Sequence, residues 1–175
     1  QIYRMLKTLP LKATRRQLRR LVDDKYLDQL EEAFANHREP PQGYRPRLRA
    51  LYGIAEAERA RALPQHLRRG ETEAVLRLIE TSHDGDRVAL YGPDGRQQPY
   101  NPEHRYTDQA LEKLAQAAEQ GLEQAQLKWI PGAYQRSIPP IDHLCDIIRH
   151  RLKGHAAAQI LGAGLGGCLL YTSPS

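Results

Sequence analysis

The stretch QILGAGLGGC, residues 159–168, decides the fold that this sequence predicts. Six consecutive residues of it contain four glycines, namely Gly162, Gly164, Gly166 and Gly167. Glycine loses more backbone entropy on folding than any other residue, so this density indicates positive φ angles or the close approach of a ligand to the main chain. Successive backbone N–H groups in such a turn form a concavity that suits phosphate. Together with the apolar run over residues 156–161, the stretch predicts a buried strand, a glycine loop and the start of a second strand.

Two common phosphate-binding motifs do not fit this stretch. A dinucleotide fingerprint would be followed by a helix and an acidic residue, and a Walker A loop would contain Lys followed by Ser or Thr. Neither pattern is present. Taken alone, the glycine stretch is also compatible with a tight hairpin that binds nothing.

Most of the remaining chain has the apolar periodicity of helices. Thr14 and Gln17 fit a capping box at a helix start, and Thr107 fits an N-cap. Pro64 falls inside the longest helical pattern and predicts a kink or a break, while Gly70 fits the residue after a helix end. One predicted helix starts at Thr14. The other predicted helices cover residues 26–36, 47–69, 71–82, 107–121 and 141–153.

The segment over residues 84–106 is rich in turn residues and differs from the helical parts. Residues 88–91 predict a short strand that leads into a turn at Asp94 and Gly95. Residues 128–140 predict a loop or a short strand. The fold class is therefore α+β, with helices packed on a small antiparallel sheet.

The composition is that of a globular protein. Of 175 residues, 40% are hydrophobic and 27% are charged, and no apolar run reaches the length of a transmembrane helix. Two cysteines and no recognisable leader lead us to expect reduced thiols and a cytoplasmic location. The net charge of +5 suits a nucleic-acid binder or a phosphate-handling enzyme. We interpret the densest basic cluster, residues 12–20, as a solvated helix face because Asp23, Asp24 and Asp28 follow it.

Both ends of the chain lead us to expect a fragment. The chain starts at Gln1, and the apolar run that begins at Cys168 gives way to the polar residues 171–175. We predict one partial domain over residues 1–170 and a non-native tail over residues 171–175.

Three separated motifs together resemble the C-terminal half of galactokinase and its relatives among the GHMP kinases. The first is a Ser-His pair with an arginine nearby, the second a Ser-x-Pro-x-x-Asp-x-Leu helix start, and the third a Gly-x-Gly-x-Gly-Gly-Cys loop. The matching residues, in order, are Ser82, His83, Arg87, Ser137, Pro139, Asp142, Leu144, Gly162, Gly164, Gly166, Gly167 and Cys168. The resemblance covers residues 47–170. Leu161 departs from it, because family members usually carry a hydroxyl residue before the first glycine.

The resemblance implies a C-terminal domain of the GHMP-kinase type and a kinase that uses ATP and Mg²⁺. The implied reaction moves the γ-phosphoryl group to a monosaccharide, with galactose at its anomeric hydroxyl as the leading substrate. Gly162, Gly164, Gly166 and Gly167 would contact the nucleotide through the backbone. The catalytic residues would lie upstream of Gln1, so none is assigned here, and neither is a metal ligand. We expect a small-molecule sugar as the partner, with no nucleic acid and no membrane.

Two other functions stay open at this point. One is a non-catalytic regulatory relative with the same fold, and the other is a basic helical module that binds nucleic acid. Ser82, His83 and Asp84 are adjacent in sequence, but members of a catalytic triad meet in space, so we predict a helix end there. We expect Cys145 to be buried and Asp142 to stabilise the first turn of its helix. Trp129 could stack on a sugar, but core packing is the favoured interpretation.

Overall fold

The structure is a computed structural model that describes residues 1–161 and 168–172, with side chains as far as Ile160. Within this part of the chain, helices predominate and the strands form two antiparallel pairs. The α-helices are α1 (Ile2–Leu6), α2 (Arg15–Leu21), α3 (Leu27–Ala35), α4 (Pro46–Arg68), α5 (Thr72–Asp86), α6 (Asp108–Glu119) and α7 (Pro139–Arg151). The strands are β1 (Leu90–Tyr91), β2 (Gln97–Gln98), β3 (Ala157–Leu161) and β4 (Cys168–Thr172). Short 3₁₀ helices are η1 (Asp24–Tyr26), η2 (Glu103–Tyr106), η3 (Glu123–Ala125) and η4 (Leu127–Trp129).

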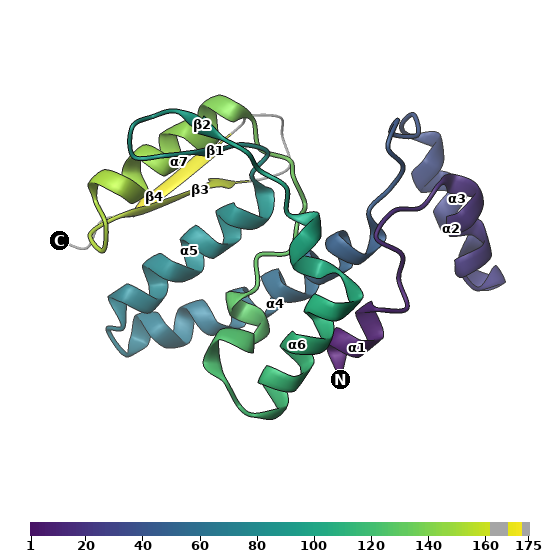
Figure 1. Cartoon of the computed structure of the whole chain (residues 1–175), viewed down its shortest axis with the longest axis horizontal. Helices are drawn as coiled ribbons and strands as arrows, with labels where there is room; N and C mark the ends of the chain where they lie inside the picture. The colour runs from purple at the N-terminus through teal and green to yellow at the C-terminus, as the bar shows by residue number, and fades with distance from the viewer. Residues whose placement is uncertain (162–167, 173–175) are drawn as a thin grey trace.

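The long helix α4 crosses the middle of the molecule, and two apolar cores adjoin it (Figure 1). The larger core joins α4 to α1, α6 and the segment after η4. Its buried members are Tyr3, Leu6, Leu48, Leu51, Tyr106, Leu111, Ala115, Ile130 and Ala133. Arg47 is buried at its edge and donates to the carbonyl oxygens of Leu9 and Tyr106 at 2.8 and 3.0 Å. These bonds satisfy a guanidinium group that would be costly to bury alone.

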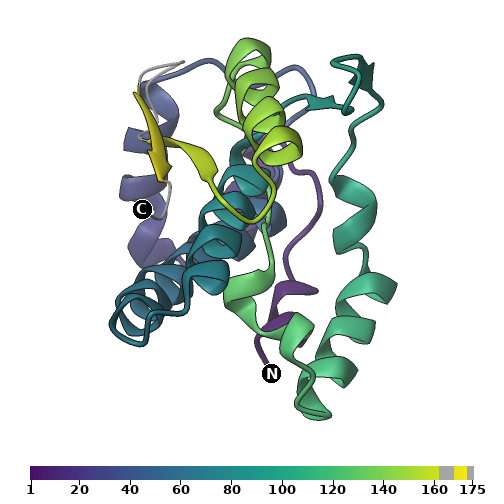
Figure 2. The same cartoon turned by 90° about the vertical axis from the view of Figure 1, so that its left-hand side faces the viewer.

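The smaller core lies under the C-terminal hairpin, where both α5 and α7 pack against β3 (Figure 2). Ala157 of β3 is fully buried against Val75, Leu76 and Ile79 of α5. The strands β3 and β4 pair in antiparallel register from Ala157 opposite Thr172 to Leu161 opposite Cys168. The predicted α+β class, with helices on a small antiparallel sheet, is confirmed at this level.

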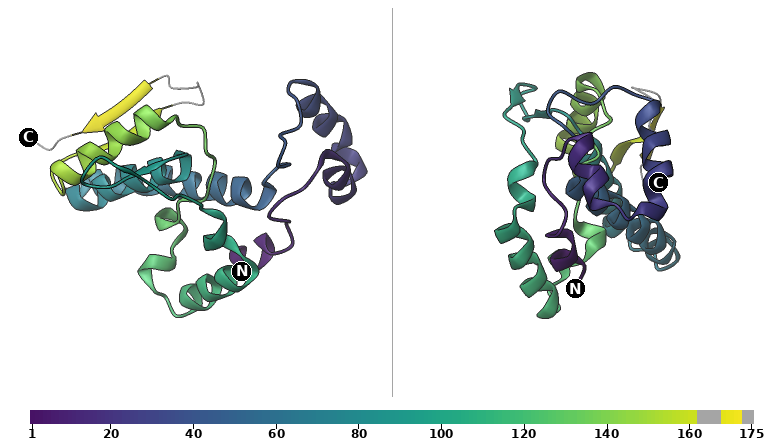
Figure 3. Two further views of the ribbon diagram at one scale, coloured as in Figure 1. Left: turned by 45° about the horizontal axis from the view of Figure 1, so that its top comes forward. Right: turned by 90° about the vertical axis from the view of Figure 1, so that its right-hand side faces the viewer.

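A helical arm made of α2, η1 and α3 projects from the body of the molecule (Figure 3). The predicted capping box at its start is confirmed, because Thr14 and Gln17 exchange hydrogen bonds between side chain and backbone. An isolated bridge between Ala13 and Tyr44 closes the base of the arm. Arg15 strengthens this base by donating to the carbonyl oxygen of Phe34 at 2.8 Å and to the Tyr44 hydroxyl at 3.0 Å.

Several local predictions are confirmed by the backbone. Gly70 has a φ of +67° directly after α4, and Thr107 accepts a hydrogen bond from the Ala110 N–H at the start of α6. Gly95 has a φ of +75° in the turn that joins β1 to β2. The possible break at Pro64 is wrong, because α4 runs through this residue to Arg68.

Helix α5 is longer than predicted, since it passes residue 82 and ends at Asp86. It can do so because Gly85 sits where no side chain fits. A Cβ there would lie 2.4 Å from the Pro131 carbonyl oxygen and 2.6 Å from the Tyr52 ring. The Gly85 carbonyl oxygen in turn accepts hydrogen bonds from the N–H groups of Tyr134 and Gln135. The glycine therefore allows close packing and does not end the helix.

The long helices of the described region carry many charged residues. None of them has a stretch that is both long and apolar enough to cross a membrane.

Candidate functional site

The glycine-rich segment joins the two strands of the C-terminal hairpin. β3 ends at Leu161 and β4 begins at Cys168, and these two residues are partners in the ladder. The predicted site residues Gly162, Gly164, Gly166 and Gly167 lie outside the described residues. The described residues include helices α5 and α7, which pack against strand β3 just before the segment.

His83 and Asp142 bring two of the three sequence motifs together. His83 lies in the last turn of α5 and Asp142 in the first turn of α7, and both side chains are fully enclosed. His83 Nε2 lies 3.3 Å from Asp142 Oδ1. The other carboxylate oxygen accepts hydrogen bonds from the backbone N–H groups of Val88 and Ala89, at 2.9 and 2.8 Å. Asp142 thus joins α7 to the segment that leaves α5.

The environment of Asp142 favours its charged form. Burial alone would raise the pKa of this carboxyl group, but the contact with His83 and the backbone donors outweigh burial and hold the pKa below its usual range. The buried Ser137 hydroxyl also lowers this pKa. The predicted first-turn position of Asp142 is confirmed, and its contacts with another segment are an additional finding.

One turn further along α7, Asp146 pairs with Arg87. The guanidinium group donates from Nη1 to Oδ2 at 3.0 Å and from Nη2 to Oδ1 at 2.8 Å. Both side chains are at most 2% exposed. Burial opposes the charge on Arg87, but Asp146, Asp84 and Asp142 outweigh it and raise the arginine pKa above its usual range. Two-point pairing of this kind fixes orientation as well as distance.

A third contact ties the same two helices together at the edge of the network. Arg149 of α7 donates to Asp84 Oδ1 at 2.9 Å and to the Glu80 carbonyl oxygen at 3.1 Å. Asp84 also lies 2.9 Å from Arg87 and so links two arginines. Burial raises the pKa of the Glu80 carboxyl group, and the nearby Arg149 partly offsets this effect.

The side chains of Ser82, His83 and Asp84 make structural contacts with three different partners. Ser82 donates to Glu56 Oε1 at 2.8 Å, His83 faces Asp142, and Asp84 pairs with Arg87. Because the three neighbours turn to different partners, they do not form a triad, as the sequence interpretation held. The buried network positions α5 and α7 on the strand that leads into the glycine segment.

Sequence reasoning included Arg87 and Asp142 but missed Asp146 and Arg149. A signal for them was present in the helical spacing. Asp142, Asp146 and Arg149 follow one another at intervals of four and three residues, which places them on one face of α7 together with Cys145. Acidic residues on the same face as an apolar one indicate buried cationic partners.

The remaining single-residue predictions have mixed outcomes. Cys145 is buried, as predicted, and burial raises the pKa of its thiol to about 12. Its neighbour Leu144 is 44% exposed. Trp129 is buried, in agreement with the interpretation that it packs inside the protein. The guanidinium carbon of Arg77 lies 4.1 Å from its ring centroid.

Two members of the basic N-terminal cluster pair with carboxylates of the protein, and most of its side chains are exposed. Lys12 pairs with Glu103 at 3.2 Å, and Arg19 makes a two-point contact with Glu31 on α3. Arg16 and Arg20 are exposed. The cluster therefore behaves as the solvated helix face that the sequence indicated.

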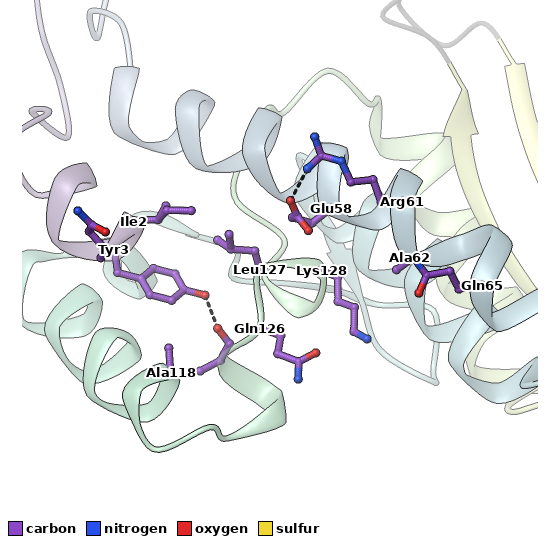
Figure 4. Close-up of a pocket in the computed structure, with 12 residues that line it drawn as sticks. Ile2, Tyr3, Glu58, Arg61, Ala62, Gln65, Ala118, Gln126, Leu127 and Lys128 are labelled. Atoms are coloured by element: carbon purple, nitrogen blue, oxygen red, sulfur yellow. Dashed lines mark hydrogen bonds and ion pairs between the residues drawn. The ribbon is translucent and has the colours of Figure 1, made fainter.

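A separate groove of the described region lies between α1, α4, α6 and the segment around η4 (Figure 4). Its volume is about 650 Å³. One wall is fixed by the Tyr3 hydroxyl, which donates to the Ala125 carbonyl oxygen at 2.6 Å, and another carries the ion pair of Arg61 with Glu58. The lining residues include no cluster of buried ionisable groups, in contrast to the contacts between α5 and α7.

Comparison of the chain with protein-family models, with curated proteins and with solved structures finds no match. The resemblance to GHMP kinases therefore rests on the sequence motifs alone.

Proposed function

We propose that this chain is part of an ATP-dependent sugar kinase of the GHMP type, with galactose as the leading substrate. One observation carries the proposal. Residues of separated motifs, His83 and Asp142, meet at 3.3 Å, and the two helices that bear them pack against the strand leading to the third motif. The first two motifs thus meet in one structural unit, next to the strand that leads to the third.

The proposed role of this unit is to position backbone groups. Phosphoryl transfer depends on positioning and charge stabilisation more than on covalent chemistry by the protein. The glycines would present backbone N–H groups to a phosphate or sugar oxygen, and the buried pairs below would keep the hairpin in a fixed orientation. The phosphate-binding loop and catalytic aspartate of such a kinase would come from the preceding part of the polypeptide, as the resemblance implies. ATP and Mg²⁺ are the proposed cofactors, and the cytoplasm is the proposed location.

A coupled ADP-release assay on the complete protein tests this proposal. The reaction contains ATP, Mg²⁺ and one aldose at a time from galactose, arabinose, galacturonate and fucose. We expect release that depends on one sugar. The 175-residue chain alone is expected to release no ADP, because the resemblance assigns none of its residues a catalytic role.

Matched glycine variants show whether the proposed loop takes part. Gly164→Val is expected to reduce kcat/KM strongly, because a branched side chain would block close backbone approach. Gly53→Ala is the control, since it lies in α4 with open space around its Cβ position. ATP binding without turnover on any sugar would favour a non-catalytic relative, and a protein that binds no ATP would contradict the proposal.

A further inference from the structure

The segment before α7 carries an aromatic ring that is held rigidly against α4. Tyr134 stacks on Tyr52 with ring centroids 5.1 Å apart and an angle of 15° between the rings. The N–H groups of Tyr134 and Gln135 both donate to the Gly85 carbonyl oxygen, at 2.6 and 3.2 Å. The ring therefore has a fixed place on the surface of the molecule.

Two arginines lie at this ring, and a third contacts the residue that follows Tyr134. The guanidinium carbon of Arg49 lies 4.4 Å from the Tyr134 ring centroid, and that of Arg136 lies 5.6 Å from the same centroid. Arg45 donates a hydrogen bond to the side-chain oxygen of Gln135, between Tyr134 and Arg136 in the chain. Gln135 itself has a φ of +57°, the one positive value of a non-glycine residue in the described part. Such a conformation costs free energy and persists where surrounding contacts enforce it.

Only part of this positive charge is balanced. Arg45 and Lys12 share the carboxylate of Glu103, at 3.1 and 3.2 Å. Asp86, which accepts from the Tyr52 hydroxyl at 2.7 Å, is an acidic group that acts on Arg49. With Arg49 and Arg136 included, four cationic groups face two carboxylates, which leaves an excess of two positive charges.

Arg49 experiences this excess most strongly. Burial lowers the pKa of its guanidinium group, and Arg136 and Arg45 lower it further, while Tyr134 and Asp86 act in the opposite direction. Its Nη1 atom is enclosed and has no hydrogen-bond acceptor among the described residues. Within the same region, neither Arg49 nor Arg136 has a carboxylate within 4.0 Å. A half-buried cation without a carboxylate partner is unfavourable, and an anion bound at the accessible nitrogen atoms of the guanidinium group would reduce that cost.

We propose that Arg49 and Arg136, placed over Tyr134, form a binding site for the phosphate group of a small molecule. A doubly charged phosphate monoester matches the excess of two positive charges. Guanidinium groups also fit phosphate oxygens well, because their N–H donors lie in one plane and can make two parallel hydrogen bonds. None of these residues belongs to the glycine-rich segment, so the site does not depend on the kinase proposal.

Thermal unfolding of the 175-residue chain in increasing inorganic phosphate tests the site, with sodium chloride at equal ionic strength as the reference. A ligand that binds only the folded state raises Tm, and a tenfold excess over its dissociation constant is expected to raise it by about 3–6 °C. The double variant Arg49→Gln/Arg136→Gln is expected to lose this shift. The control Arg16→Gln/Arg68→Gln removes the same charge from exposed positions and is expected to keep it.

Further variants keep the outcome clear. Arg136 is exposed, so Arg136→Gln alone is expected to fold and to weaken the response to phosphate. If Arg49 serves only to neutralise Asp86, Arg49→Gln changes stability but leaves the phosphate response intact, and the proposal fails. It also fails if chloride gives the same shift, or if a single-stranded oligonucleotide stabilises the chain while inorganic phosphate does not.

Discussion

Removal of the buried charge on Arg87 is the perturbation with the most definite consequence for stability. Arg87→Met would leave the Asp146 carboxylate, 1% exposed, with the Tyr91 N–H at 2.9 Å as its remaining close donor. Breaking a buried ion pair from one side costs about 3–5 kcal/mol, because the other charge is left unpaired in the interior. Asp146→Ala is expected to cost less, since Arg87 keeps Asp84 at 2.9 Å.

The double variant shows whether the two losses have a common origin. Arg87→Met/Asp146→Ala is expected to lose less than the sum of the single variants by about 2 kcal/mol, because neither charge is then left alone. Free energies of unfolding come from urea titrations followed by circular dichroism. Arg61→Gln, which breaks the exposed pair with Glu58, is the control and is expected to have little effect. Additive losses, or a loss below about 1 kcal/mol for Arg87→Met, would refute the reasoning.

Three further predictions follow from single side chains. Gly85→Ala is expected to lower the free energy of unfolding by about 1–3 kcal/mol through overpacking, whereas Gly53→Ala in the exposed part of α4 is expected to raise it by up to about 1 kcal/mol; urea titration of both variants decides this. Asp142 and Asp86 have pKa values shifted in opposite directions and are expected to have opposite effects on unfolding measured from pH 3 to 7. Because the folded-state pKa of Asp142 is lowered, its contribution is present above its unfolded pKa of about 3.9 and lost as the pH falls, and Asp142→Asn removes this dependence. Because burial raises the folded-state pKa of Asp86, its ionisation lowers stability as the pH rises above about 4, and Asp86→Asn is expected to abolish that loss. Cys145 is expected to resist iodoacetamide at pH 8 in the folded protein and to react in urea, as peptide mapping by mass spectrometry would show; rapid labelling of the folded protein would contradict its burial.

Signals that act within a few residues were read correctly from the sequence. The Thr14 capping box, the turn at Gly95 and the helix end at Gly70 depend on local backbone chemistry, and the structure has all three. Apolar periodicity likewise predicted the main helices, because each helix needs one face to pack against a core.

Features that depend on distant contacts were not predicted. Gly85 was interpreted as part of a turn, but the approach of Pro131 and Tyr52 makes it a packing position inside α5. The predicted kink or break at Pro64 did not include a break for a different, local reason. Pro64 and Ala60 are exposed, so the carbonyl oxygen that proline leaves without a partner can bind water.

The candidate site was predictable only in its parts. The sequence supplied the motifs that contain His83, Arg87 and Asp142, but the pairing of Arg87 with Asp146 is a contact between helices that no local pattern specifies. The charged cluster around Tyr134 was also not predicted, because its arginines come from α4 and from a segment more than eighty residues later.

The sugar-kinase proposal is tested most directly by observing the phosphorylated product. The complete protein is incubated with ATP, Mg²⁺ and galactose, and the reaction is followed by ³¹P nuclear magnetic resonance. We predict that the γ-phosphate signal of ATP is replaced by the signals of ADP and of a sugar phosphate whose phosphorus couples to the anomeric proton. Conversion of ATP to ADP and inorganic phosphate alone, or no conversion by a folded protein with any aldose of the panel, would contradict the account.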